Sequence, residues 1–249
     1  MIAVDVSLAL ELLDDFTGRR VKPAQVRFFL DGQPVRPIAK PDGWFLLVDQ
    51  PAGEHVLAIE GEGFQREELR FSGGPEGERE ETLYLLPSPA YRFGRRVTTL
   101  TVRLVDKRRR PLAGRTLYRL GDARQSLRLA QDDAGPKSAA LRLFRAESPA
   151  RLPVPGLFYL EDGEVGELVR LTGMSGALYA LEKPLASAHR RGCLLRPARA
   201  LTTDAQGCAF LALPGAAEAA LLVPGKAGLR LERVTAAELA HSEAELAPE

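Results

Sequence analysis

The sequence has few residues of the types that bind metals or form disulfides. It contains 2 Cys, 3 His, 2 Met and 1 Trp in 249 residues. Two cysteines cannot build the disulfide framework of a small secreted domain, so we expect free thiols in a reducing compartment. Residues 1–8 lack the basic segment of a secretory signal, and Asp5 interrupts their apolar run. We therefore predict a cytoplasmic protein, or one released as part of a larger particle.

Long apolar runs and an excess of one charge are missing as well. No apolar run approaches the ~18 residues that a membrane-spanning helix needs, so we predict no membrane span. The chain has 34 Lys and Arg against 33 Asp and Glu, which gives a net charge of +1. A balanced chain has no overall field that would attract nucleic acid. Its two basic clusters, Lys107–Arg110 and His189–Arg191, contain no aromatic residue that could stack on bases.

Motifs for metal binding or catalysis are not apparent. His55, His189 and His241 lie far apart, and none belongs to a zinc-binding pattern. Cys193 and Cys208 fall on neighbouring predicted strands, but a metal site would need two further ligands of suitable type. Pairing of Cys193 with His189 is the sharpest catalytic alternative, although no third residue that would orient the pair can be named. We predict no cofactor, no metal and no enzymatic activity.

Turns and short apolar alternations, by contrast, are plentiful. The stretch 41–64 contains a turn at Pro41–Gly43, an apolar run at Trp44–Val48, a second turn, and an alternating segment at His55–Ile59. A related pattern returns at 203–215. Two copies of one turn-and-strand pattern predict an all-β protein with two related β-sandwich modules.

The order of these segments predicts four parts. Six or seven short strands with regular turns predict a first sandwich, and the Pro-Ser-Pro sequence beginning at Pro87 predicts a stiff linker. A capping box at Thr235–Glu238 predicts a final helix reaching about Leu246. The predicted parts are a module at 1–87, a linker at 88–97, a second module at 98–234 with an insertion at about 121–197, and a helix or tail at 235–249.

The insertion has no counterpart in the first module. Residues 156–160 and 165–171 alternate around a Glu-Asp-Gly-Glu turn and predict a hairpin. Residues 121–137 are polar and predict a loop, whereas 138–146 fit either a strand or a short helix. The insertion therefore carries strands of its own and is expected to form a small subdomain.

The repeated pattern resembles the carboxypeptidase regulatory-like family of accessory modules. Asp42–Leu46, Pro51–Leu57 and Gly63-Phe64 carry the resemblance in the first module. Residues 203–210 and 213–215 carry it in the second. The resemblance implies a transthyretin-like, Ig-type sandwich in each module. It implies little about function, because such modules are fused to many partners.

We predict a non-enzymatic structural or adaptor protein that docks onto other subunits of a multiprotein assembly, such as a phage-tail-like contractile injection particle. One alternative is a carbohydrate or surface-polymer binding module that stacks sugars on Trp44, Tyr159 and Tyr179. Another is an accessory subunit or enzyme with its site in the insertion. The oligomeric state is left open. The predicted partner contacts are Arg108, Arg109, Arg110, Tyr159, Arg190 and Arg191.

Overall fold

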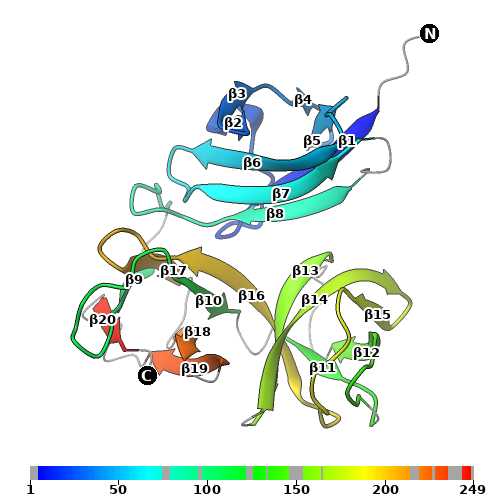
Figure 1. The fold of residues 1–249 in the computed structure, drawn as a ribbon, viewed down its shortest axis with the longest axis vertical. Coiled ribbons are helices and arrows are strands. Elements are labelled where there is room, and N and C mark those ends of the chain that lie inside the picture. Colours follow the sequence, from blue (N-terminus) through cyan, green and yellow to red (C-terminus); the bar gives the residue numbers. More distant parts are fainter. Residues whose placement is uncertain are drawn as a thin grey trace. The chain divides into compact units, whose positions relative to one another are not determined.

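The protein folds almost entirely into β-strands, which confirms the predicted all-β class (Figure 1). The computed structural model describes residues 5–74, 79–94, 97–121, 126–132, 134–145, 154–163, 165–213, 219–225, 228–234 and 243–247. The chain forms two compact units, Met1–Arg96 and Val97–Glu249, called unit 1 and unit 2 below. A short 3-10 helix, η1 (Pro23–Gln25), interrupts the strands of unit 1.

Unit 1 consists of two four-stranded sheets with the orders β4-β5-β1-β8 and β3-β2-β6-β7. Strand β1 pairs antiparallel with β5 and parallel with β8, so the first and last strands of the unit lie side by side. The proline-rich stretch that follows β2 forms only the short edge strands β3 and β4. The strands are β1 (Val6–Asp14), β2 (Val26–Leu30), β3 (Gln33–Val35), β4 (Ile38–Ala39), β5 (Trp44–Val48), β6 (Gly53–Gly61), β7 (Glu67–Gly73) and β8 (Glu80–Leu85).

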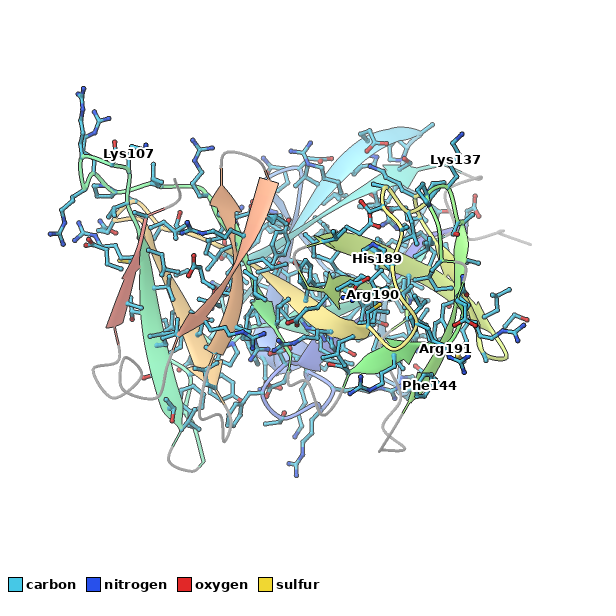
Figure 2. All side chains as sticks on the ribbon, turned by 90° about the horizontal axis from the view of Figure 1, so that it is seen from below. Lys107, Lys137, Phe144, His189, Arg190 and Arg191 are labelled. Atoms are coloured by element: carbon cyan, nitrogen blue, oxygen red, sulfur yellow. The ribbon has the colours of Figure 1, made fainter. Side chains whose placement is uncertain are left out.

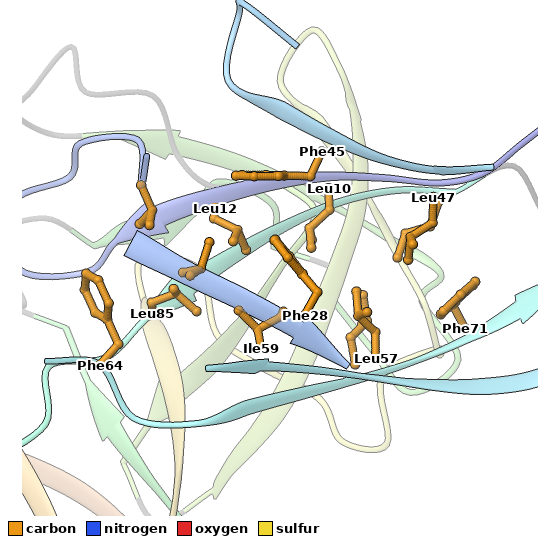
Figure 3. Packing of buried hydrophobic residues seen from close by; sticks show 14 residues of the cluster. Leu10, Leu12, Phe28, Phe45, Leu47, Leu57, Ile59, Phe64, Phe71 and Leu85 are labelled. Carbon is orange, nitrogen blue, oxygen red and sulfur yellow. The ribbon is translucent and has the colours of Figure 1, made fainter. Parts of the chain in front are cut away.

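The inner faces of these two sheets share one apolar core, which Figure 3 shows between the strands. Alternation places Leu8, Leu10 and Leu12 on one face of β1, and each is at most 1% exposed. The other sheet supplies Leu57 and Ile59, both 0% exposed. Full burial of one such side chain stabilises the fold by about 1.5–3 kcal/mol. Unit 1 therefore has a sandwich-like arrangement.

The repeated sequence pattern forms the same turn in both units. In unit 1 the Gly43 amide donates to the Lys40 carbonyl, and the Lys40 amide donates to Trp44. In unit 2 the Gly207 amide donates to Asp204, and the Asp204 amide donates to Cys208. Both glycines have positive φ, 88° at Gly43 and 75° at Gly207, a conformation that favours glycine. Each turn sets the register of the strand that follows it.

Residues 88–94 of the predicted linker pack onto unit 1. The Tyr91 hydroxyl donates to an Asp14 carboxylate oxygen at 2.5 Å. The Tyr91 ring also contacts Phe16, Phe64 and Phe93, with ring centroids 4.8–5.9 Å apart. Asp14 accepts further bonds from its own loop. This segment is thus anchored by an aromatic cluster and by a buried carboxylate.

Glu67, the first residue of β7, links the stability of unit 1 to pH. Burial and the nearby Asp15 carboxylate raise the pKa of Glu67 from 4.5 to about 7. The folded unit therefore binds more protons than the unfolded chain between these two pH values, and its stability falls as the pH rises through that window. At 1.36 kcal/mol per pKa unit, the loss reaches about 2–3 kcal/mol above the folded pKa.

We expect Glu67→Gln to abolish this decline, because glutamine keeps the shape of the neutral acid and does not ionise. Urea unfolding followed by the fluorescence of Trp44 measures it, since the chain has 1 Trp and that residue lies in unit 1. Glu80→Gln, at an exposed carboxylate of β8, is the matched control. An unchanged slope between pH 4.5 and about pH 7 in the Glu67 variant would contradict the assignment.

His55 accounts for a separate decline at higher pH. Its ring nitrogens lie 2.7 Å from the Asp31 carboxylate and 2.9 Å from the Pro51 carbonyl oxygen. The Asp31 hydrogen bond, followed by that to Pro51, raises the pKa of His55 above its usual 6.5. The resulting stabilisation is fully present below pH 6.5 and is lost as the pH rises through the raised pKa. We expect this second decline to persist in the Glu67 variant.

Unit 2 combines a sandwich-like part with a second structure built into it. One sheet of the sandwich has the order β17-β9-β20, and the other contains β16, β10, β18 and β19 in that order. Both sheets bury apolar side chains completely, including Leu100, Val102, Leu117 and Leu221 at 0% exposure. The strands are β9 (Thr98–Leu104), β10 (Thr116–Leu120), β16 (Leu194–Thr202), β17 (Cys208–Leu213), β18 (Ala219–Gly225), β19 (Gly228–Val234) and β20 (Glu243–Leu246).

The segment between β10 and the middle of β16 closes into a six-stranded ring. Its pairings run in the order β11-β12-β15-β14-β13-β16, and β16 pairs again with β11. This closed β-barrel ends at Pro197, and the rest of β16 pairs with β10 in the sandwich. One strand therefore belongs to both structures (Figure 1). The further strands are β11 (Leu127–Leu129), β12 (Ala140–Arg145), β13 (Gly156–Asp162), β14 (Val165–Ser175) and β15 (Leu178–Leu181).

These strands confirm some of the predictions made from the sequence and contradict others. The predicted hairpin is confirmed as β13 and β14, and the ambiguous segment at 138–146 contains the strand β12. The polar segment at 121–137 was wrongly expected to be only a loop, because Leu127 and Leu129 form a strand facing the barrel interior. The final helix is wrong for Glu243–Leu246, which pair as β20 with the edge of β9. The rest of that predicted helix, 235–242, lies outside the described residues.

Candidate functional site

One end of the barrel interior is lined by two carboxylates. The hairpin alternation that buries Phe158 and Leu160 also turns Asp162 inward, and the facing strand turns Glu167 inward beside Val169. The Asp162 and Glu167 side chains are 7% and 18% exposed. A charged group at such a position needs hydrogen-bond donors, because its desolvation is otherwise too costly. The donors come from the segment between β15 and β16.

This segment, residues 182–193, covers the end of the barrel and is called the cap. Asp162 accepts hydrogen bonds from the Arg190 amide at 2.7 Å and from Arg190 Nε at 2.8 Å. Glu167 accepts from the Ala186 amide at 2.9 Å and lies 2.8 Å from His189 Nε2. The His189 side chain is 0% exposed. The cap is therefore fixed to the hairpin by the two carboxylates. Figure 2 labels His189 and Arg190, the cap residues that they hold.

The cap does not contain an activated cysteine. Burial, with the nearby Asp162 carboxylate, raises the pKa of Cys193 to about 11, so this thiol stays protonated near neutral pH. His189 Nε2 faces Glu167, and Nδ1 lies 3.8 Å from Asp162 without a hydrogen bond. In the described residues, no three His, Cys, Asp or Glu side chains are arranged to hold a metal ion. These groups hold the cap closed.

We expect Asp162→Asn to loosen the cap. Asparagine keeps the shape but loses the charge, and a hydrogen bond to a charged group is worth about 1.5–3 kcal/mol. Hydrogen exchange at the Arg190 amide should accelerate by roughly tenfold or more as local opening becomes easier. Glu182→Gln, at a half-exposed carboxylate of the same segment, is the control. Equal protection of Arg190 in wild type and Asp162→Asn would show that the carboxylate does not hold the cap.

The barrel packs against the sandwich through a buried junction. Tyr159, on the outer face of β13, is 6% exposed and lies in a cluster with Leu120 and Leu222 of the sandwich sheet. Its ring lies across Gly166, so closely that a Cβ at that position would be 1.9 Å from the Tyr159 hydroxyl. Burial, followed by the nearby Glu161 carboxylate, raises the pKa of Tyr159. This residue belongs to the junction and not to an exposed contact surface.

A buried ion pair crosses the same junction. Arg196 of β16, 7% exposed at its side chain, donates to Glu161 at 3.2 Å and twice to the Gly121 carbonyl oxygen. Glu161 also accepts from Arg233 of β19 at 2.8 Å. The barrel and the sandwich are thus joined by a shared strand, an apolar cluster and a charged network.

The wall of the barrel formed by β11, β12 and β15, away from the junction, is exposed and carries apolar and basic side chains. Of the six large apolar side chains that are exposed in the described residues, Phe144, Met174 and Leu178 lie on the neighbouring strands β12, β14 and β15. Arg128 and Arg142 are the cross-strand neighbours of Phe144 and Leu178. We call Arg128, Arg142, Phe144 and Leu178 the barrel face, because cross-strand pairing places them on the same side of the sheet. Met174 is paired with the inward-facing Tyr179 and is not part of it. Neither arginine forms an ion pair in the part of the chain that the structure describes.

The predicted partner contacts are spread over separate regions. Arg109 pairs with Glu245 of β20 at 2.8 Å, and Arg110 pairs with Asp106 of its own loop at 2.7 Å, so both arginines already have partners within unit 2. Arg108 is exposed on that loop. Arg190 is engaged by Asp162, as described above. Arg191 is exposed. It lies beside the barrel face, because it precedes Gly192, whose carbonyl oxygen accepts a hydrogen bond from Arg128.

The aromatic residues proposed to stack on sugars do not form a common surface. Tyr159 is buried in the junction, and Tyr179 is 9% exposed and faces the barrel interior. Trp44 lies in unit 1 and is partly buried. Unit 1 has a groove of about 860 Å³ between its short edge strands, lined by Phe29, Pro34 and Ile38 among others.

We did not identify the cap carboxylates or the barrel face from the sequence, although the alternation of apolar residues indicates both. Asp162 and Glu167 are in phase with the apolar positions of their hairpin, which marks them as inward-facing charges. Phe144 is out of phase with Leu141 and Leu143, which marks it as an outward-facing aromatic residue. Alternation thus indicated a direction for each side chain. It could not show which strands would be neighbours.

Comparison with protein-family models, with curated proteins and with solved structures found no match. The resemblance to carboxypeptidase regulatory-like modules therefore stays a prediction. In the described residues, no helix has the length and apolar character needed to cross a membrane.

Proposed function

We propose that this chain is a non-enzymatic structural or adaptor protein, built on tandem Ig-like, transthyretin-like sandwich modules, that docks in a multiprotein assembly. By analogy of module type, the setting we favour is a phage-tail-like contractile injection particle, assembled in the cytoplasm and released from it. The proposed partners are other protein subunits of that assembly.

The observation that most supports this proposal is the attachment of the barrel. A shared strand, the Tyr159 cluster and the Arg196 network hold the barrel on the sandwich sheet. Such an attachment keeps surface residues of both parts at fixed spacing, as an adaptor requires, because little conformational entropy remains to be lost on docking. The repeated turn supports the tandem-module part of the proposal.

Purification of the tagged chain from its native cells, after mild crosslinking, tests the proposed function. We expect a stoichiometric complex with defined protein subunits, larger than the 27.1 kDa of the free chain. Gentle lysis without crosslinking should recover the same complex at lower yield. A chain that stays monomeric under both conditions, with no stoichiometric partner, would refute the proposal.

A further inference from the structure

We infer that the barrel face, formed by Arg128, Arg142, Phe144 and Leu178, docks an acidic segment of a partner protein that also carries aliphatic or aromatic side chains. This inference rests on the proposed adaptor function and names the surface and the partner chemistry.

The apolar part of the barrel face is exposed and contiguous. Phe144 and Leu178 are 44% and 46% exposed. Leu178 pairs with Arg142, two residues before Phe144, so the two apolar side chains lie on one face of the sheet. Adjacent exposed apolar groups of this kind mark interaction surfaces more often than scattered ones do. Phe and Arg are also side chains that are enriched at protein interfaces.

The charge on the barrel face selects an acidic partner. Arg128 and Arg142 have no carboxylate partner in the described residues. Two acidic side chains of neighbouring segments each lie near another arginine: Asp132 is 3.5 Å from Arg191, and Glu182 is 3.9 Å from Arg170. Within the described part of the chain, two guanidinium groups thus lie beside apolar side chains without an acidic partner, and such groups favour carboxylates that flank an apolar residue.

The backbone beneath the barrel face is already satisfied. Strand β12 is paired with β11 and β15, and β15 is paired with β12 and β14, so neither offers a free edge. A partner cannot add a strand there, and recognition has to come from side chains. Leu178 does not stack on bases as aromatic groups do, which makes a protein segment a better fit than nucleic acid.

Selection of displayed random peptides on the full-length protein tests this inference. We expect the enriched peptides to combine Asp or Glu with Leu, Phe or Trp. The best peptide, synthesised with a fluorophore, should bind the double variant Phe144→Glu/Arg142→Glu at least tenfold more weakly than wild type, because central aromatic and arginine residues dominate interface energies. Its affinity for wild type should fall as salt is added.

The matched control is Leu229→Glu/Arg115→Glu, which changes an exposed leucine and an exposed arginine elsewhere in unit 2. This control should bind the peptide as wild type does. The inference is overturned if no peptide is enriched, if enriched peptides lack acidic residues, or if the control weakens binding equally. It is also overturned if a labelled oligonucleotide binds wild type and the barrel-face variant abolishes that binding instead.

Native purification separates this inference from the function on which it rests. If wild type and the barrel-face variant recover the same complex, the adaptor function stands and the barrel face is not the docking surface. If wild type recovers no complex, the adaptor function itself fails. If only the barrel-face variant loses a subunit, and circular dichroism shows that it is folded, both proposals are supported.

Discussion

Gly166→Ala should destabilise unit 2 by about 1–3 kcal/mol, the range for overpacking, because the added Cβ would meet the ring of a buried tyrosine. The new Cβ would lie 1.9 Å from the Tyr159 hydroxyl oxygen and 2.3 Å from the ring carbon that carries it. The ring cannot easily move away, because Tyr159 is 6% exposed and packed against Leu120 and Leu222. Backbone strain plays no part, since Gly166 does not have a positive φ.

A double-mutant cycle isolates this steric term. In a Tyr159→Leu background the clash disappears, and Gly166→Ala should be neutral or slightly stabilising, because alanine suits a strand better than glycine. Chemical unfolding followed by far-UV circular dichroism measures both units, and Trp44 fluorescence separates unit 1 as an internal reference. An equal penalty in both backgrounds would mean that Tyr159 does not occupy the space over Gly166.

Arg196→Met should cost unit 2 about 3 kcal/mol, because removing a buried guanidinium takes one of two arginine partners from Glu161 and leaves the Gly121 carbonyl oxygen without its arginine donors. Arg196 makes three hydrogen bonds at 7% side-chain exposure. Methionine fills much of the volume, so the loss reports the charge network and not a cavity. The Gly121 carbonyl oxygen, to which Arg196 donates twice, loses both of those donors.

Adding Glu161→Leu to Arg196→Met should recover part of the loss, since an apolar pair of similar volume can replace a buried ion pair. Arg233 would then lose its bond to Glu161, but its side chain is 50% exposed and stays hydrated. Arg230→Met, in an exposed pair with Glu232, is the control and should change stability by less than about 1 kcal/mol. A double variant less stable than Arg196→Met alone would contradict this account.

Much of the strand pattern could be predicted from the sequence, because alternation and turn chemistry are local. The repeated turn-and-strand pattern predicted strands within 41–64 and 203–215, and these stretches contain β5 and β17. The hairpin predicted from residues 156–160 and 165–171 is β13 and β14. These features depend on neighbours in the chain, so a single sequence suffices to indicate them.

The barrel and the last strand could not be predicted, because they depend on distant pairings. Nothing local to Leu127–Leu129 indicates that these residues pair with the start of β16, which closes the ring. Glu243–Leu246 have a helical composition, yet the edge of β9 offers them backbone partners that outweigh this weak preference. The cap could not be predicted for the same reason, since its two carboxylates lie some twenty residues before the groups that they bind.

The shared strand β16 has a consequence for synthesis on the ribosome. All barrel strands have been translated once residue 197 is made, whereas the sandwich sheet that covers the Tyr159 cluster still lacks β18 and β19. A domain tends to fold from its N-terminal side as the chain emerges, so the barrel can close on a scaffold that is not yet complete. During that interval the outer wall of β13 and β14, with Leu157 and Leu168, is uncovered. We expect nascent chains arrested before residue 219 to aggregate or recruit chaperones. Longer nascent chains, which include β18 and β19, should do neither.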